Sequence, residues 1–394
     1  MTEDLIDVSI IGGGIGGLAA ALALQLANPH LKVKVYERDQ HMSDRRQGYG
    51  LTLTNNKSGP LAKLGLLEDC INCNSTCPSN SHYTFDSAGN VIGYYGRAIK
   101  SKYFVQQSAA PRLPQLGGNE GNLRIPRQEL RALLLQRLQP DTVVWGKKLL
   151  NFFENENEVE VHFDQDSNLN NAAAATIIKT KILVGADGIK SVVRNLMDER
   201  VTNNDRAGIN LPIEKSLKYI GISVIIGLSS SRRPHPLTHN RGFYVVDGSH
   251  RLFTMPFVRR RAKATASSSL LTPAYPREDN EQDDDVEEYL TMWQLSFSGL
   301  DEEQAAVLKQ QAAADLLQTA LHRTAAWFSA VRELLNQTIP TEIWATGLFD
   351  RDPMQVSVAS AGKKARWSRV TCLGDACHPM SMFKGPSIRT SIDS

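Results

Sequence analysis

Three glycines near the N-terminus have the spacing of a loop that binds the phosphates of a dinucleotide. Gly12, Gly14 and Gly17 fit the pattern G-x-G-x-x-G, and Glu37 follows twenty residues after the last of them. In this pattern the first glycine permits a tight turn, the second lets the backbone approach a pyrophosphate, and the third allows close packing of helix on strand. The N–H groups at a helix N-terminus attract phosphate. Glu37 can accept hydrogen bonds from ribose hydroxyls, and its charge would repel a 2′-phosphate.

The elements that must hold these residues are a strand, a helix and a second strand. The sequence predicts a buried strand at Asp7–Ile11, an Ala/Leu-rich helix at Ile15–Ala27 and the next strand at Leu31–Tyr36. Glycine-rich turns are common in proteins, so a purely structural turn is the alternative interpretation. Because strand, helix and acid all stand in register, we favour a phosphate site of the Rossmann type at this turn.

Two further aspartates stand where an apolar strand meets the element that follows it. The segment Ile182–Arg194 ends its strand at Asp187, and the segment Val370–Pro379 ends its strand at Gly374-Asp375. Open α/β sheets bind ligands at the carboxyl ends of their parallel strands, so both corners are candidate ligand sites. Taken alone, each aspartate is better explained as the N-cap of a helix.

The three corners, together with Arg127 at the start of an R-x-x-L sequence, resemble those of a known family. They are similar to the FAD-dependent aromatic monooxygenases of the para-hydroxybenzoate hydroxylase type, which use one polypeptide with FAD and NAD(P)H. The resemblance covers Asp7 to about Gly385 and is specific at four short motifs. It implies that the glycine turn and Glu37 hold the ADP half of FAD.

The resemblance also implies a role for each remaining motif. Gly374 and Asp375 would bind the ribityl and pyrophosphate region of FAD, and Asp187 would contribute to both FAD and nicotinamide-nucleotide binding. Arg127 would contact FAD, as would one arginine of the Arg45-Arg46 pair. The predicted cofactor-binding residues are therefore Gly12, Gly14, Ile15, Gly17, Glu37, Arg38, Arg46, Arg127, Asp187, Gly374 and Asp375.

The reaction implied by the resemblance demands little from protein side chains. NADH or NADPH reduces FAD, O₂ adds to give a flavin C4a-hydroperoxide, and a small aromatic or related electron-rich substrate takes one oxygen atom. The protein supplies position, a dry pocket and dipoles that tune the flavin. No catalytic acid or base is predicted, and His378 beside the third corner is interpreted as structural. Tyr244, Met255, Phe257 and Trp293 are candidates for pocket lining, although alternating apolar residues on strands are usually core.

The order of the patterns along the chain predicts the fold class. We expect an α/β fold in which a split, Rossmann-like FAD-binding domain of the glutathione-reductase type carries an inserted, mainly β substrate domain. The FAD-binding domain is expected at 1–80, 122–200 and 346–394, the last part incomplete. The substrate domain is expected at 81–121 and 201–345, with a polar, disordered insert at about 259–288.

Hydrophobic periodicity predicts the remaining elements. Helices are expected at Asn55–Leu67, Arg124–Leu138, Glu302–Thr319 and Ala325–Leu335. One β-hairpin is expected within Tyr83–Phe104, and a second joins Gly242–Val246 to Arg251–Phe257. Further strands are expected at Leu149–Phe153, Val159–Phe163, Tyr219–Leu228 and Leu290–Phe297, with a long hairpin tip at Asp164–Thr176.

Charge and cysteine content exclude several classes of protein. The 394 residues carry 44 Lys and Arg against 42 Asp and Glu, a net charge of +2, so no nucleic-acid footprint is visible. With no apolar run of membrane-spanning length and no room for a signal peptide, a cytoplasmic protein without a membrane partner is expected. The five cysteines argue against a disulfide framework. The pattern C-x-x-C-x-x-x-C from Cys70 is better explained as free thiols in a loop than as a metal site.

Near its C-terminus the sequence departs from the family pattern. The family continues after the third corner through a Pro-Phe-x-Gly-x-Gly loop into a long helix. Here Met382 stands at the expected proline, Ser387 at the second expected glycine, and the sequence given stops at Ser394. We therefore expect a chain truncated inside the cofactor site. One alternative is a catalytically impaired flavin-binding remnant. Another is a different flavin oxidoreductase on the same fold, such as a reductase or a halogenase, although the sequence lacks the Trp-x-Trp-x-Ile stretch of halogenases.

Overall fold

Two large β-sheets, each covered by helices, and one small two-stranded sheet make up the part of the chain that can be described. The computed structural model describes residues 5–44, 50–74, 81–96, 122–164, 176–205, 217–232, 235, 237–238, 241–259, 288–351 and 367–379. The predicted insert at about 259–288 and the predicted hairpin tip at Asp164–Thr176 lie outside these ranges except for their end residues, and the residues after 379 lie outside them entirely.

The first sheet is mainly parallel and contains the glycine turn. Within the described residues its strands are β1 (Ile6–Ile11), β2 (Val33–Tyr36), β7 (Val143–Val144), β8 (Leu149–Glu154), β9 (Val159–Phe163), β10 (Thr176–Gly185) and β16 (Val370–Cys372). Their order is β7-β2-β1-β10-β9-β8, with β16 paired to β10. Strands β7, β2, β1, β10 and β16 run parallel, whereas β8 and β9 form antiparallel pairs beyond β10. This arrangement confirms the predicted α/β, Rossmann-like fold class.

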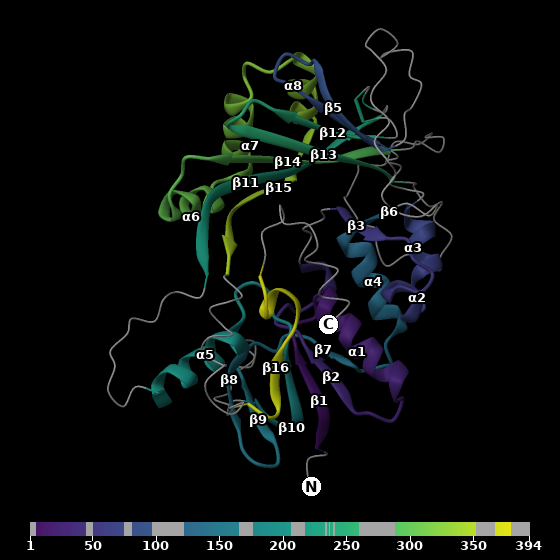
Figure 1. The fold of residues 1–394 in the computed structure, drawn as a ribbon, viewed down its shortest axis with the longest axis vertical. Coiled ribbons are helices and arrows are strands. Elements are labelled where there is room, and N and C mark those ends of the chain that lie inside the picture. Colours follow the sequence, from purple (N-terminus) through teal and green to yellow (C-terminus); the bar gives the residue numbers. More distant parts are fainter. Residues whose placement is uncertain are drawn as a thin grey trace, which may run out of the picture.

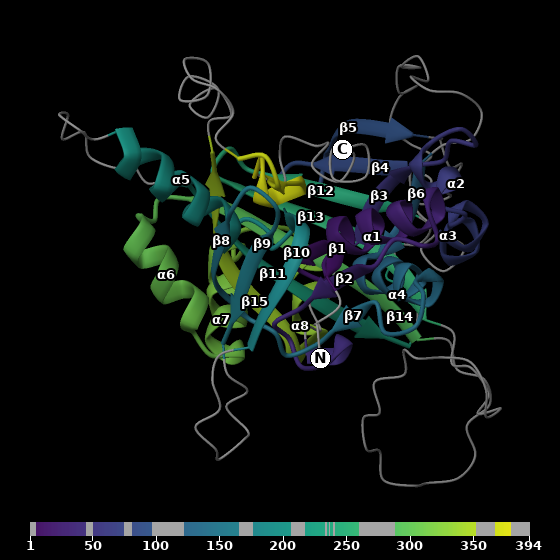
Figure 2. The ribbon, with the colours of Figure 1, turned by 90° about the horizontal axis from the view of Figure 1, so that it is seen from below.

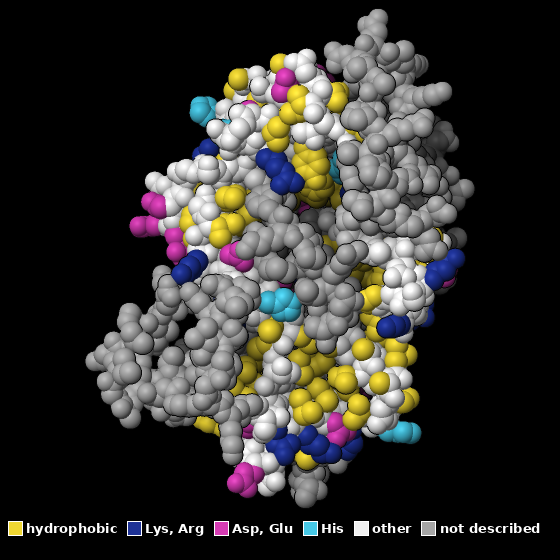
Figure 3. Space-filling model, viewed as in Figure 1, with side chains coloured by type: hydrophobic (Ala, Val, Ile, Leu, Met, Phe, Trp, Pro, Cys, Tyr) yellow, Lys and Arg dark blue, Asp and Glu magenta, His cyan; other side chains and the backbone are white. Residues whose placement is uncertain are grey.

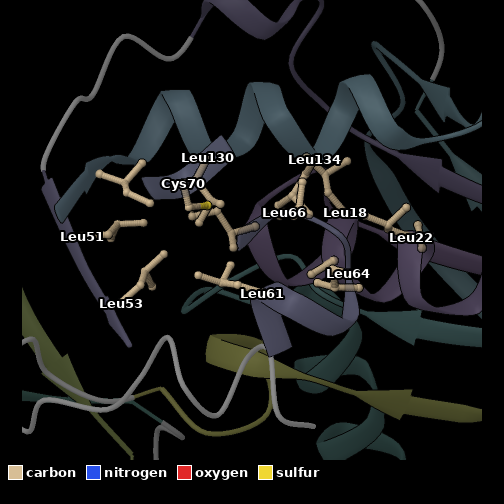
Figure 4. Close-up of a cluster of buried hydrophobic side chains, with 14 of the residues drawn as sticks. Leu18, Leu22, Leu51, Leu53, Leu61, Leu64, Leu66, Cys70, Leu130 and Leu134 are labelled. Atoms are coloured by element: carbon tan, nitrogen blue, oxygen red, sulfur yellow. The ribbon is translucent and has the colours of Figure 1, made fainter. Parts of the chain in front are cut away.

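Helices cover the faces of the first sheet. Among the described residues they are α1 (Ile15–Ala27), α2 (Pro60–Lys63), α3 (Leu67–Asn74), α4 (Arg127–Arg137), α5 (Val192–Asp205) and the short 3₁₀ turns η1 (Met42–Asp44) and η2 (Gly374–Ala376). Leucines from α1, α2 and α4 meet in one core, with Cys70 of α3 among them (Figure 4). Helix α1 is rich in Ala and Leu, which favour helix formation, and Leu18 and Leu22 anchor it on the sheet.

The second sheet is a larger, mainly antiparallel layer. Its described strands are β4 (Ser81–Phe85), β5 (Val91–Gly96), β11 (Lys218–Ser231), β12 (Gly242–Val246), β13 (His250–Arg259), β14 (Glu288–Ser298) and β15 (Thr338–Asp350), in the order β15-β11-β14-β13-β12-β4-β5. Helices α6 (Glu302–Gln310), α7 (Ala313–Arg323) and α8 (Ser329–Asn336) contribute to its main core. Figure 1 shows α7 and α8 on the side of this sheet farther from the first sheet.

The two layers are connected by a small third sheet. Strand β3 (Gly50–Thr54) pairs antiparallel with β6 (Asn122–Pro126), and β6 leads directly into α4. Figure 1 shows the carboxyl ends of β1 and β10 directed toward the second sheet, and Figure 2 gives the same arrangement from below. Lys and Arg side chains gather at the opposite, lower end of the first sheet (Figure 3). At that end Lys181 Nζ pairs with Asp7 Oδ1 at 2.7 Å.

Several predicted helices differ from the observed ones, each for a local reason. The helix expected at Asn55–Leu67 is two short helices, α2 and α3, because Gly65 adopts a positive φ of +69° between them. The helix expected at Glu302–Thr319 is divided into α6 and α7 at Gln311, whose backbone is extended with ψ 151°. The helix expected from Ala325 begins only at Ser329, as α8.

Two further predictions are corrected by the structure. The helix expected from Arg124 begins at Arg127, because residues up to Pro126 pair with β3 as strand β6. Cys70 and Cys73 lie on helix α3 and not in a loop. Cys70 is fully buried, and this desolvation raises the pKa of its thiol to about 12. Both hairpins are confirmed by the antiparallel pairs β4–β5 and β12–β13.

Candidate functional site

The three corners predicted from the sequence lie at adjacent strand ends of one sheet. Ile11 of β1 pairs with Gly185 of β10, and Gly185 pairs with Cys372 of β16, all in parallel register. Backbone hydrogen bonds continue this register beyond the strands, from Ala186 N to Ile11 O (2.8 Å) and from Leu373 N to Gly185 O (2.9 Å). Because parallel strands end at the same edge, the turns that follow β1, β10 and β16 are neighbours.

Two of the three glycines in the first turn are required by the fold itself. Gly12 has φ +111°, and a Cβ atom there would lie 2.5 Å from the carbonyl oxygen of Ala186. A Cβ on Gly17 would lie 2.0 Å from the carbonyl oxygen of Gly12, so only glycine lets α1 approach this turn. These contacts are the close helix–strand packing that the spacing predicts.

Gly14 differs from the other two because nothing in the fold itself requires a glycine there. It is the N-cap of α1 with φ −77°, and a Cβ atom at this position would meet no described atom within 4 Å. No side chain of the described residues caps α1, and its first turn has no acidic residue. An uncapped helix N-terminus beside open space fits a bound phosphate group.

Glu37 is buried against the glycine turn. Its Oε2 accepts a hydrogen bond from Gly13 N (2.7 Å), and its Oε1 accepts one from Asp39 N (3.0 Å). The carboxylate thus fixes the turn, and each oxygen has a further lone pair able to accept a hydroxyl hydrogen bond. Arg38, next to it, is exposed. Arg46, predicted to contact FAD, lies outside the described residues.

Asp187 caps the helix that follows the second corner. Its Oδ2 accepts hydrogen bonds from the N–H groups of Val192 (2.7 Å) and Val193 (3.3 Å), and its Oδ1 accepts one from Ser191 Oγ. Ser191 Oγ in turn accepts from Arg194 N at 3.0 Å. Ser191, directly before α5, is therefore the N-cap residue, and Asp187 satisfies two further N–H groups of the first turn from outside the helix.

Arg194 was not predicted, yet it connects the second corner to the third. This buried side chain donates from Nη2 to Ile189 O (2.7 Å) and from Nη1 to Ala376 O (2.8 Å). Burial lowers the pKa of its guanidinium, and Arg351 nearby lowers it further. Its partners are carbonyl groups 5 and 182 residues away along the chain. A local motif gives no signal for such contacts.

Asp375 lies at the third corner and faces Arg127. Gly374 has φ +57°, which permits the tight turn after β16. Asp375 retains surface exposure, but the surrounding protein partly desolvates its carboxyl group and raises its pKa. The charges of Arg127 and His378 oppose this rise. Arg127 at the start of α4 therefore lies within electrostatic range of the third corner.

A cluster of side chains lies on the face of the second sheet that is away from its helices. We call this cluster the aromatic wall; its members are His82, Tyr244, Phe253 and Met255, together with Arg124 from β6. The ring of Phe253 is stacked 5.8 Å from that of His82 and lies 5.1 Å from that of Tyr244. Arg124 Nη2 lies 3.3 Å from His82 Nδ1. Burial lowers the pKa of His82 to about 3, and Arg124 contributes, so this ring is neutral at physiological pH.

The remaining candidates for pocket lining lie elsewhere. Trp293 is fully buried on the helix-covered face of the second sheet, where its Nε1 donates to Thr338 Oγ1 at 3.0 Å. It is therefore core and not lining. The side chain of Phe257 lies outside the described residues, as does Cys77 of the cysteine pattern. In the ranges that the structure describes, no group of three or more His, Cys, Asp or Glu side chains is arranged to hold a metal ion.

Comparison with known sequences agrees with this geometry. A family model described as an NAD(P)-binding Rossmann-like domain matches residues 10–52, which include the glycine turn and Glu37. YetM of Bacillus subtilis (strain 168), described as an FAD-dependent monooxygenase, is 30% identical over 202 residues, 51% of this chain and 47% of that protein. The match thus spans about half the length of that relative. The 6-hydroxynicotinate 3-monooxygenase of Pseudomonas fluorescens is 23% identical over 95% of this chain and 76% of its own length.

Solved structures share the fold over nearly the whole chain. The 2,6-dihydroxypyridine-3-hydroxylase of Arthrobacter nicotinovorans aligns with a TM-score of 0.65 at 16% identity, covering 99% of this chain and 82% of that chain. Klebsiella pneumoniae HpxO, complexed with FAD and uric acid, aligns with a TM-score of 0.63 at 17% identity, covering 98% of this chain and 77% of that chain.

Fold and glycine turn together define a Rossmann-like domain of the dinucleotide-binding type. The relatives support the family predicted from the sequence, since the chain is similar to proteins described as FAD-dependent monooxygenases. Among its described residues, no helix combines the length and the apolar character needed to cross a membrane.

Proposed function

We propose that this protein binds FAD along the carboxyl edge of the first sheet and uses NAD(P)H and O₂ to hydroxylate a small aromatic substrate. The observation that carries the proposal is the convergence of three sequence-distant turns at one edge, where a Cβ atom on Gly14 would meet only open space. When bound, FAD supplies the redox chemistry that takes electrons from NAD(P)H and activates O₂.

The residues present fit the parts of FAD in order. The turn Gly12–Ile15 and the α1 N-terminus would hold the pyrophosphate, with Gly17 keeping the helix close. Glu37 would accept the ribose hydroxyls of the ADP half, with Arg38 beside it. Charged and turn residues at the other corners would hold the rest of the cofactor: Arg127, Asp187, Gly374 and Asp375.

The aromatic wall supplies a surface suited to an aromatic substrate. The partly exposed rings of Tyr244 and Phe253 offer flat apolar contact, and the buried guanidinium of Arg124 behind them adds positive charge beside His82. The carboxyl edge of the first sheet is directed toward the second sheet, so a ligand between them would lie near both (Figure 1). The names or ligands of three of the proteins reported above are small heteroaromatic compounds: a hydroxynicotinate, a dihydroxypyridine and uric acid.

The direct test is an absorption spectrum of the purified protein. We expect flavin bands at about 350–500 nm, either as purified or after reconstitution with FAD. We also expect NAD(P)H oxidation to accelerate severalfold when a suitable hydroxylated heteroaromatic compound is added. A colourless protein that cannot be reconstituted with FAD would contradict the proposal. Flavin binding without any NAD(P)H oxidation would contradict the monooxygenase activity alone.

A further inference from the structure

Arg131 is a buried arginine whose contacts join three segments of the first layer. Its Nε donates to the carbonyl oxygen of Gly13 at 2.9 Å, and its Nη1 donates to that of Met42 at 3.3 Å. Its guanidinium lies over the ring of Trp145, 5.5 Å from the centroid. The side chain is 5% exposed. Arg131 thus ties the turn after β1 to the segments that follow β2 and β7.

The contact with Gly13 acts on the peptide group that leads into the phosphate site. Glu37 Oε2 holds the N–H of Gly13, and Arg131 holds its C=O. Since a peptide unit is planar and trans, fixing the Gly13 carbonyl also fixes the N–H of Gly14, which points the opposite way. Gly14 is the residue whose Cβ position is open. Arg131 therefore sets the direction of a hydrogen-bond donor at the α1 N-terminus.

The charge of Arg131 also favours an anion at this position. A guanidinium stays protonated in proteins and presents its donors in a rigid planar fork, which suits it to hold two carbonyl groups at once. Burial keeps solvent from screening the charge fully, so a phosphate bound one peptide unit away experiences part of its field. Lysine, with one flexible ammonium group, would keep the charge but not the fork.

We propose that Arg131 is a positioning residue of the dinucleotide site, which pre-orients the Gly13–Gly14 peptide and thereby raises the affinity for the pyrophosphate of FAD. The proposal rests on the proposed function, because it requires that FAD bind at this turn. The glycine motif and the R-x-x-L sequence at Arg127 do not predict the contact between Arg131 and Gly13, because these two residues are 118 positions apart in sequence.

The test compares FAD affinity with stability in three variants. Arg131→Met keeps an unbranched stem but removes the donors, Arg131→Lys keeps the charge, and Arg137→Met is a control on the same helix. Arg137 forms an ion pair with Asp69 near the surface, with a side chain 47% exposed. FAD and ADP dissociation constants are measured on the apoprotein by fluorescence titration, and the unfolding temperature is measured without ligand.

We expect Arg131→Met to weaken binding of both FAD and ADP by about 10- to 100-fold, as for the loss of a charge-assisted hydrogen bond. Arg131→Lys should recover part of this loss, and Arg137→Met should bind as the wild type does. Unchanged affinity in Arg131→Met would overturn the proposal. The proposal would also be overturned if, across the three variants, FAD affinity changed only in proportion to the unfolding temperature of the ligand-free protein, since Arg131 would then have a structural role only. If the wild type binds neither FAD nor ADP, the proposed function itself fails.

Discussion

Two corners of the first sheet have similar sequences but opposite arrangements at the helix N-terminus. Both begin with an apolar strand, turn at a glycine and enter a helix, β1 into α1 and β10 into α5. At α5 the Asp187 carboxylate and the Ser191 hydroxyl accept hydrogen bonds from the first N–H groups. At α1 the N-cap is Gly14, and no side chain of the described residues accepts a hydrogen bond as a cap there.

The difference shows how one kind of turn can serve either the fold or a ligand. A helix N-terminus has N–H groups without partners inside the helix, and they must be satisfied by side chains, water or a ligand. The α5 corner satisfies them from its own sequence, so its aspartate stabilises the protein. At the α1 corner no described side chain does so, and our proposal assigns these N–H groups to the pyrophosphate of FAD, with Glu37 and Arg131 fixing the surrounding peptide groups. Substitutions at Gly17, Gly14, Arg194 and Asp187 test this contrast.

The largest effect is expected from Gly17→Ala. The added methyl group would lie 2.0 Å from the Gly12 carbonyl oxygen, and this backbone atom can move only if the turn is rebuilt. We expect the free energy of unfolding to fall by about 3 kcal/mol or more, as measured by denaturant titration without ligand. Gly14→Ala is the control and should cost about 1 kcal/mol or less, because its methyl group meets open space. Equal losses in the two variants would contradict the distinction between them.

Gly14→Asp makes the α1 corner resemble the α5 corner. Aspartate is a better N-cap than glycine and also interacts favourably with the helix dipole, so the ligand-free protein should gain a few tenths of a kcal/mol. FAD affinity should fall by about 100-fold or more, because the carboxylate occupies the cradle and repels the pyrophosphate. Gly14→Asn places a side chain of similar size without the charge, and we expect a smaller loss of FAD affinity for this variant. Titration of each apoprotein with FAD measures the affinity of the two variants. Unchanged affinity in Gly14→Asp would place the pyrophosphate elsewhere.

The sequence predicted much of this contrast because it is local. The strand, turn and helix around Gly12 depend on residues within one β-α-β unit, and they are confirmed. Strand β6 was missed because its pairing with β3 joins residues far apart in sequence, from 68 positions for Thr54 and Asn122 to 76 for Gly50 and Pro126. The division of the expected helices at Gly65 and Gln311 is a matter of single backbone angles, which periodicity does not report.

The buried arginines show the limit of sequence interpretation at the site. Arg131 and Arg194 occur in helical patterns typical of solvated positions, yet both are buried and donate to backbone carbonyl groups. Carbonyl groups occur at every residue, so no residue type in the sequence marks the partner. The sequence pattern also did not predict which face of the second sheet each strand residue occupies. Tyr244 and Met255 belong to the aromatic wall, whereas Trp293 points into the helix-covered core.

Arg194→Met tests whether the second and third corners act as a unit. The substitution leaves the carbonyl groups of Ile189 and Ala376 without their donor, and we expect a loss of about 2 kcal/mol in unfolding free energy. FAD affinity should fall as well, because the turn at Asp375 loses its connection to α5. Lys190→Met, four residues earlier and exposed, is the matched control and should change neither quantity. A variant with reduced stability and full FAD affinity would show that the corners bind independently.

Asp187→Ala and Asp187→Asn together test the smallest effect. The alanine variant removes the acceptor of the Val192 and Val193 N–H groups and should lose about 1 kcal/mol, whereas asparagine keeps one acceptor oxygen and should lose only a few tenths. Because both carboxylate oxygens already accept hydrogen bonds within the corner, we expect Asp187→Asn to keep FAD affinity within about threefold of the wild type. Denaturant titration and FAD titration give the two quantities separately. A tenfold loss of FAD affinity in the stable asparagine variant would show that the charge of Asp187 reaches the cofactor, and the α5 corner would then serve both the fold and the ligand.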